Sequence, residues 1–290
     1  MQKLRQYLSL IKFSHTIFAL PFALIGYSLA IKEVEIFSNT SKIKLFFLVV
    51  LCMIFARSAA MAFNRYIDRK IDAKNPRTAS REIPAGIISE QKALYFVLIN
   101  CVLFIATTFY INAICFYLSP IALFTILFYS YTKRFTSLCH FVLGIGLSLA
   151  PIGAYLAVAG AFSLLPILFS ITVFTWVAGF DIMYALQDEE FDKSEQLFSI
   201  PSQLGITKAL KLSIIVHFIT AALIVGIGLY SNLNYSYWIG ASIFIALLIY
   251  QHKIVKPNDL SRINLAFGTT NGIASLVFAF FTILSIYFSK

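Results

Sequence analysis

The chain alternates between long apolar runs and short polar connections. Nine runs approach the roughly 20 apolar residues that a helix needs to cross the hydrocarbon core of a membrane. This pattern predicts an all-α, polytopic membrane protein with about nine transmembrane helices in one bundle, formed by a single domain over residues 1–290. The predicted helices cover residues 13–31, 43–63, 93–111, 113–131, 138–160, 163–185, 208–230, 235–250 and 265–288.

Composition excludes a soluble protein. Hydrophobic residues make up 59% of the chain and charged residues only 12%, and a soluble chain of 290 residues cannot bury that much apolar surface. The net charge of +10 therefore predicts basic loops beside a lipid bilayer and no nucleic-acid partner. The four cysteines lie inside apolar runs without a C-x-x-C pair, so we expect ordinary buried thiols.

Lys and Arg are distributed unevenly between the connections. The third, fifth and seventh connections contain neither residue, whereas the N-terminus and most other connections are rich in them. The positive-inside rule then places the N-terminus in the cytoplasm and, with nine spans, the C-terminus outside. We expect a multi-pass protein of the cell (inner) membrane. Only four of the 23 Lys and Arg fall on the outer side: Lys32, Lys42, Lys44 and Lys290.

The connection after the second run carries a polar motif. Asn64, Asp68 and Asp72 recur every fourth position, a step that turns a helix by about 40°, so all three share one face. Each step rises roughly 6 Å, so the two carboxylates can hold a hard cation between them. Such an acidic face among basic residues suits a Mg²⁺-bound phosphate, and the alternative is a charged loop that only sets topology. The basic residues are Arg65, Arg69, Lys70, Lys74, Arg77 and Arg81.

A second acidic motif follows the sixth run. Asp188 and Asp192 are four residues apart, and Asp181 lies two helical turns before Asp188, so the three share a face. For any one acid, a salt bridge or a loop cap is the ordinary explanation. Two matched motifs on one membrane face weaken that explanation and predict carboxylates that hold more than one Mg²⁺ around a diphosphate. The two motifs lie four predicted helices apart, which also predicts two four-helix halves plus a ninth helix.

The two motifs together resemble those of the UbiA superfamily of membrane aromatic prenyltransferases, and the resemblance covers most of the chain. It extends from residues 72–78 (DAKNPRT) to Gly86, and from Asp181-x-x-Tyr184-Ala to the Ser-Ile-Pro at 199–201. The tract 129–135 (YSYTKRF) is similar to the loop after the family's fourth helix. The details are most similar to the 4-hydroxybenzoate polyprenyltransferase branch. Similar proteins often have Gly-Leu-His before the Ser-Ile-Pro, whereas this chain has QLF at 196–198, and the difference bears on substrate specificity.

The resemblance implies Mg²⁺-dependent transfer of a polyprenyl chain from an allylic polyprenyl diphosphate to an aromatic acid, in quinone biosynthesis. It assigns a direct diphosphate contact to Lys133, which joins the motif aspartates in the catalytic set. The implied metal ligands are Asp68, Asp72, Asp188 and Asp192, with Asn64. The implied substrate-binding residues are Asn64, Arg57, Arg77, Arg81, Tyr131, Asp181 and Tyr184.

Some of these residues have a physical argument of their own. Arg57 lies seven residues before Asn64 and shares its helical face, where it suits the acceptor carboxylate, although a snorkelling arginine is equally expected. Tyr129, Tyr131 and Tyr184 lie beside the motifs and could shield a nascent allylic cation. Such neighbours are common in a chain with 29 Phe and 15 Tyr. The histidines lack metal-like spacing and are expected to pack: His15, His140, His217 and His252.

Two alternatives remain from the sequence. Within the same class, a dihydroxynaphthoate for menaquinone is the second candidate acceptor. From another class, a secondary transporter would normally keep its coupling carboxylates near the bilayer midplane, whereas these carboxylates lie at helix ends. The sequence leaves the tail length of the donor and the oligomeric state open.

Overall fold

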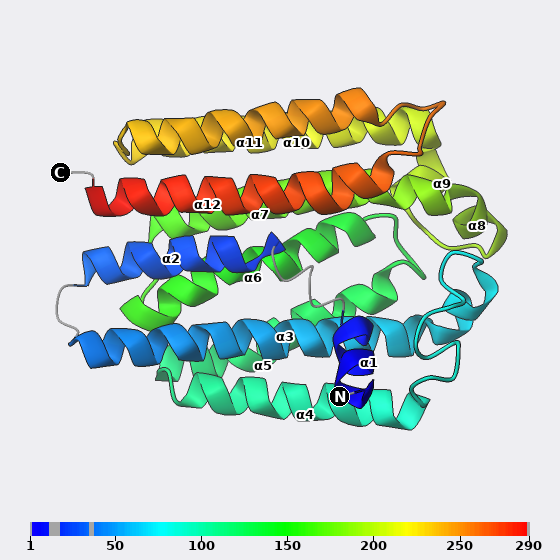
Figure 1. Cartoon of the computed structure of the whole chain (residues 1–290), viewed down its shortest axis with the longest axis horizontal. Helices are drawn as coiled ribbons and strands as arrows, with labels where there is room; N and C mark the ends of the chain where they lie inside the picture. Colours follow the sequence, from blue (N-terminus) through cyan, green and yellow to red (C-terminus); the bar gives the residue numbers. More distant parts are fainter. Residues whose placement is uncertain (1, 12–17, 35–37, 289–290) are drawn as a thin grey trace.

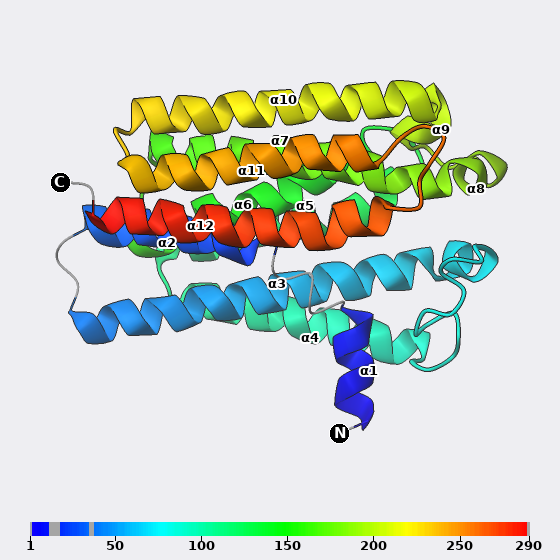
Figure 2. The ribbon, with the colours of Figure 1, turned by 45° about the horizontal axis from the view of Figure 1, so that its top comes forward.

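The structure of the chain, a computed structural model, describes residues 2–11, 18–34 and 38–288. Within these ranges the chain forms helices and no β-strand, as the sequence predicts. Figures 1 and 2 show long helices packed side by side along one axis, with α1 running across them. The elements are α1 (Gln2–Leu10), α2 (Leu20–Glu33), α3 (Asn39–Lys74), α4 (Glu90–Phe109), α5 (Ala113–Thr132), α6 (Cys139–Ala159), α7 (Leu164–Tyr184), η2 (Ala185–Asp188), α8 (Glu189–Ser194), α9 (Ile200–Leu204), α10 (Ile206–Tyr230), α11 (Tyr235–Ile254), η3 (Leu265–Thr270) and α12 (Asn271–Phe288).

Seven of the described helices are long and apolar enough to cross a membrane, so this is a multi-pass membrane protein. The predicted count of nine is not confirmed. The two other long helices are α2, which has 14 residues, and α11, which begins with Tyr-Ser-Tyr-Trp and ends with Gln-His-Lys-Ile, so that polar groups interrupt its apolar character. Residues 13–17 of the first predicted run, which include His15, lie outside the described ranges, as do Lys12 and Lys290.

Helix α2 packs on both halves of the bundle, which also meet directly where α6 packs on α7. Helices α3, α4, α5 and α6 pack on one another, while α7 packs on α10, α10 on α11, and α11 on α12. Helix α2 packs against both α6 and α12. The helix outside the halves is therefore the first long one, whereas the sequence analysis placed the ninth helix outside them. The reason is its apolar surface, because Phe22 of α2 lies in a fully buried aromatic cluster with Trp176, Phe244 and Phe278.

Helix α3 is longer than a membrane span and carries the first acidic motif near its C-terminal end. It is unbroken for 36 residues, about 54 Å at 1.5 Å per residue, whereas the hydrocarbon core is about 30 Å thick. The Ser38 side chain accepts a hydrogen bond from the Ser41 amide and caps the start of the helix. The helix ends at Lys74 because Pro76 disfavours the helical conformation of the preceding Asn75. The motif at 64–72 is thus helical, as predicted.

Both acidic motifs lie at the same end of the bundle. Helices α3 and α7 run in the same direction, and the connection 75–89 lies with α8 and α9 at the right of Figures 1 and 2. An ion pair between Lys74 Nζ and Glu195 Oε2, at 2.6 Å, links the two connections. The halves α3–α6 and α7–α12 each carry their motif at the end of their first long helix. The prediction that both motifs share one face of the membrane protein is consistent with this arrangement.

The crossing of α2 and α6 depends on Gly26. A Cβ atom at this position would lie 2.0 Å from the carbonyl oxygen of Pro151, which is backbone and cannot turn aside. We expect Gly26→Ala to separate the two helices and lower the free energy of unfolding by about 1–3 kcal/mol, because overpacked contacts cost this much. Thermal unfolding of the purified protein in detergent measures the change. Gly226→Ala is the control, since its Cβ would meet nothing within 4 Å, and equal Tm values for both variants would contradict the expectation.

Candidate active site

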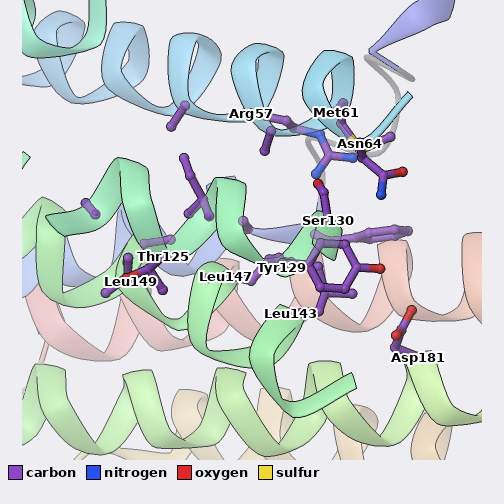
Figure 3. A pocket seen from close by; sticks show the side chains of 18 of the residues that line it. Arg57, Met61, Asn64, Thr125, Tyr129, Ser130, Leu143, Leu147, Leu149 and Asp181 are labelled. Atoms are coloured by element: carbon purple, nitrogen blue, oxygen red, sulfur yellow. The ribbon is translucent and has the colours of Figure 1, made fainter. Parts of the chain in front are cut away.

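A cavity of about 930 Å³ lies beside both motifs and extends into the apolar part of the bundle. Its walls come from α3, α5, α6, α7 and the loop after α3. Figure 3 shows Arg57 and Asn64 on α3 facing Tyr129 of α5 and Asp181 of α7. Farther from the motifs the lining becomes apolar, as at Leu147. The cavity therefore joins a charged mouth to a chamber suited to hydrocarbon.

The acids of the first motif are each held by an arginine. Arg134, from the turn after α5, donates a hydrogen bond to Asp68 Oδ1 at 2.9 Å, and Asn64 Nδ2 donates to Asp68 Oδ2 at 3.1 Å. Arg81 donates to Asp72 Oδ1 at 2.7 Å. Asn64, Asp68 and Asp72 all line the cavity, so the prediction that they share one helical face is confirmed.

Asp188 of the second motif is bound by the loop that follows the first. Arg77 contacts both carboxylate oxygens, from Nε to Oδ1 at 3.0 Å and from Nη2 to Oδ2 at 2.5 Å. Asn75 Nδ2 also donates to Oδ1 at 3.0 Å, and Arg77 Nη1 donates to the Tyr184 hydroxyl at 3.1 Å. Burial lowers the pKa of Arg77, but the hydrogen bonds and charge of Asp188 outweigh burial and raise it. The loop after α3 and the end of α7 are thus joined by a charged pair.

Asp192 lies behind the cavity wall. It is fully buried and does not line the cavity, whereas its partner Lys133 does, with Nζ 2.6 Å from Asp192 Oδ1. Burial lowers the pKa of Lys133, and the negative charge of Asp192 more than compensates, so the pKa is raised. The Phe198 amide donates to the Lys133 carbonyl oxygen at 2.7 Å and fixes this end of α5. The sequence places Asp192 among the metal ligands, yet in this arrangement it serves as the counter-ion of Lys133.

The chemistry of these side chains suits Mg²⁺, because carboxylate and amide oxygens are the hard ligands that it prefers. Asp72 Oδ2 is buried and accepts no hydrogen bond, and Arg65 Nη1 lies 4.0 Å from it. Among the described residues, however, no three Asp, Glu, His or Cys side chains are gathered as a ready metal site. The four predicted ligand aspartates are instead paired with four cations: Asp68 with Arg134, Asp72 with Arg81, Asp188 with Arg77, and Asp192 with Lys133.

Comparison with known families decides what kind of enzyme contains this cavity. The sequence pattern of the UbiA prenyltransferase family matches residues 19–284, which is nearly the whole chain. This chain belongs to that family. It is therefore a prenyltransferase, and the resemblance seen in the sequence is confirmed.

Relatives and solved structures of UbiA proteins agree with this assignment. The chain is 31% identical over 223 residues to a 4-hydroxybenzoate octaprenyltransferase of Tolumonas auensis, covering 77% of this chain and 78% of the relative. It is similar to the apo structure of a UbiA homologue from Aeropyrum pernix K1, with 30% identity, a TM-score of 0.78 and coverage of 94% and 97%. A UbiA homologue from Archaeoglobus fulgidus bound to DMAPP and Mg²⁺ shares the fold, with 22% identity, a TM-score of 0.75 and coverage of 98% and 99%.

The remaining predicted site residues of this UbiA prenyltransferase divide into two groups. Arg57, Asp181 and Tyr184 line the cavity. Tyr131 does not line it: the ring packs edge-on against Phe63, beneath the Arg134 guanidinium, and is 41% exposed. The cavity lining therefore gives no support to Tyr131 as a substrate-binding residue, which stays a prediction. Its neighbour two residues earlier, Tyr129, lines the cavity instead.

Three residues that contact the motif acids were missed from the sequence. Asn75 lies in the tract 72–78 and Arg134 in the tract 129–135, both of which resemble the family. The sequence did not indicate which acids they contact. His140, expected to be an ordinary packing residue, forms a hydrogen bond with Asp181. Nothing in its spacing indicated this, because 41 residues separate the pair. By contrast, His217 and His252 contact each other, with Nδ1 and Nε2 2.8 Å apart.

The Arg77–Asp188 pair generates a stability prediction. Arg77→Leu leaves a carboxylate that is only 10% exposed without its bidentate partner, so we expect a loss of about 1–3 kcal/mol in the free energy of unfolding. The matched control is Lys193→Leu, which removes an i,i+4 pair with Glu189 on α8; because the lysine is 52% exposed, the loss should be less than about 1 kcal/mol. Thermal unfolding in detergent measures both, and a larger loss for Lys193→Leu would count against the role of Arg77.

Proposed function

We propose that this UbiA prenyltransferase transfers a polyprenyl chain from an allylic polyprenyl diphosphate to an aromatic acid, with 4-hydroxybenzoate as the acceptor in quinone biosynthesis. The observation that carries the proposal is one cavity with a charged mouth and an apolar interior. A prenyl diphosphate has the same two parts. The Tolumonas auensis relative, named a 4-hydroxybenzoate octaprenyltransferase, supports this choice of acceptor.

The mouth of the cavity supplies positive charge for a leaving diphosphate. Its four cations each neutralise an aspartate, so an entering diphosphate offers them an alternative anion. The aspartates that these cations neutralise are the residues that would hold Mg²⁺ through their carboxylate oxygens. Bound Mg²⁺ supplies Lewis-acid stabilisation of the charge that builds on the diphosphate. The cations are Arg77, Arg81, Lys133 and Arg134, and the ligands are Asp68, Asp72, Asp188 and Asn64, joined by Asp192 when Lys133 leaves it.

The rest of the cavity serves the allylic group. The allylic C–O bond breaks, the diphosphate leaves with the bonding electrons, a carbon–carbon bond forms to the ring beside its hydroxyl, and the ring releases a proton. Tyr129 and Tyr184 line the cavity, and aromatic faces stabilise positive charge. The apolar walls exclude the water that would otherwise capture the cation. The hydrocarbon tail occupies the apolar chamber.

Arg57 is placed to bind the acceptor carboxylate. Unlike the four cations at the mouth, it has no ion-pair partner among the described residues, and its buried Nε donates no hydrogen bond. Figure 3 shows Arg57 and Asp181 on facing walls of the cavity. We place between them an acid whose hydroxyl lies at the opposite end of the ring. Its carboxylate contacts Arg57 and its hydroxyl faces Asp181.

The cavity mouth, in this proposal, faces the cytoplasm. The support is the distribution of basic residues, because the connections at 75–89 and 255–264 carry several Lys and Arg at the motif end. The soluble diphosphate product and the aromatic acid then exchange directly with the cytoplasm, while the donor tail stays in the bilayer.

Metal dependence is the first test of this function. Asp72→Asn or Asp188→Asn keeps the shape of the side chain but removes a charged ligand, so we expect kcat/KM to fall about 100-fold or more. Activity should vanish with a chelator and return with Mg²⁺. Prenyl transfer in membranes, measured by mass spectrometry of the product, gives the rates.

Glu189 and Glu190 provide the matched controls for the metal site. Neither lines the cavity, and Glu189 pairs with Lys193 instead. Glu189→Gln and Glu190→Gln should therefore change kcat/KM by less than about threefold. Equal losses at all four positions would mean that only bulk negative charge matters, and full activity in Asp72→Asn or Asp188→Asn would overturn the site.

The acceptor is tested through Arg57. Arg57→Ala should raise the KM for 4-hydroxybenzoate about tenfold or more and leave the KM for the donor nearly unchanged, because only the acceptor carries a carboxylate. Steady-state kinetics with each substrate varied in turn separate the two effects. An unchanged acceptor KM would contradict the carboxylate contact, and turnover of a dihydroxynaphthoate alone would identify the other acceptor.

A further inference from the structure

His140 connects a cavity carboxylate to the backbone of a different segment. It lies in the first turn of α6 and is only 3% exposed. Its Nδ1 lies 2.7 Å from Asp181 Oδ2, and the Ile200 amide donates to its Nε2 at 3.2 Å. Because an amide N–H only donates, Nε2 is the acceptor and the ring proton is on Nδ1. The imidazole therefore donates to Asp181 as a neutral group.

The contact leaves Asp181 half engaged. His140 occupies Oδ2, whereas Oδ1 has no hydrogen-bond partner among the described side chains. Asp181 lines the cavity from the last turn of α7, and Figure 3 shows it directed toward Tyr129. Unlike the other motif aspartates, it has no Lys or Arg partner in the described part of the chain. It is the carboxylate on this wall that remains available to an uncharged donor such as a phenol hydroxyl.

A neutral partner suits this position. Four cations gather at the cavity mouth, and a mobile carboxylate would be attracted to them. A hydrogen bond from the neutral imidazole fixes the orientation of Asp181 and leaves its negative charge in place. The Ile200 amide holds the other side of the ring, so the imidazole itself cannot rotate freely.

We propose that His140 is a positioning residue for prenyl transfer: its Nδ1–H fixes the Asp181 carboxylate toward the hydroxyl of the aromatic acceptor, and Ile200 fixes His140. The inference rests on the function proposed above. It predicts that loss of the Nδ1 donor harms acceptor use and leaves donor use intact. Loss of the Nε2 contact alone has a smaller effect, because the donor to Asp181 remains.

Two amide substitutions separate the two contacts. In His140→Asn the side-chain amide lies near the position of Nδ1 and can still donate to Asp181. In His140→Gln the longer side chain brings the amide to the position of Nε2, where it can accept from the Ile200 amide. It then offers no donor to Asp181 at the position of Nδ1. His140→Ala removes both contacts. His252→Asn is the matched control, because His252 does not line the cavity and contacts His217 instead.

Steady-state kinetics with acceptor and donor varied separately provide the test. We expect His140→Gln and His140→Ala to lower kcat/KM for the acceptor about 10- to 100-fold, since misplacement of a reacting partner costs this much. His140→Asn should stay within about threefold of the unchanged protein, as should His252→Asn, and the donor KM should be constant throughout. Thermal unfolding of each variant identifies a loss that comes only from instability.

The outcomes distinguish the roles. Retained activity in His140→Gln with loss in His140→Asn would show that His140 acts only through its hydrogen bond with the Ile200 amide. Equal activity in all variants would show that His140 has no role in acceptor use. Either result overturns the proposal. Nitrogen NMR of histidine-labelled protein tests the pair without turnover: a proton on Nδ1 is expected, and a proton on Nε2 alone contradicts it. Absence of product from any aromatic acid in the unchanged enzyme would instead contradict the proposed function.

Discussion

Neutralisation of buried carboxylates is the constraint on which the active end of this protein depends. An aspartate removed from water is costly unless a cation or a metal compensates it, and four such acids lie at one end of the bundle. Each is paired with a basic residue, and the pair between Arg77 and Asp188 connects the two halves directly. The exposed pair of Lys74 and Glu195 spans the same gap but contributes less, because water screens it.

The same pairs give the site its capacity to respond to a substrate. In the proposed function, a cation that neutralises an aspartate would bind a diphosphate once Mg²⁺ took its place at the carboxylate. Metal and diphosphate would then favour each other's binding, since either one alone would leave unpaired charge. Arg57 and Asp181 stand apart from the exchange, one without an ion-pair partner and the other held by the neutral His140. The cavity thus separates a mouth of ion pairs from the position proposed for the acceptor.

Helix architecture makes this separation possible. Helix α3 is long enough to carry Arg57 farther inside the bundle and Asp72 at the motif end, both on the face that lines the cavity. Helix α2 packs against α6 and α12 through Gly26 and Phe22, and the apolar chamber lies between α3, α5 and α6. A hydrocarbon tail and a diphosphate can then lie in one cavity, each in surroundings of its own polarity.

The sequence by itself determined the membrane class, the helical motif of Asn64, Asp68 and Asp72, and the family, because hydrophobic run length and four-residue spacing are local properties. Only the tertiary structure decided which cation neutralises which aspartate, that Asp192 lies behind the wall, and that Tyr131 faces outward. The same holds for His140 and Asp181, which come together across 41 residues. Such contacts depend on how helices pack and turn about their axes, and no local pattern encodes that.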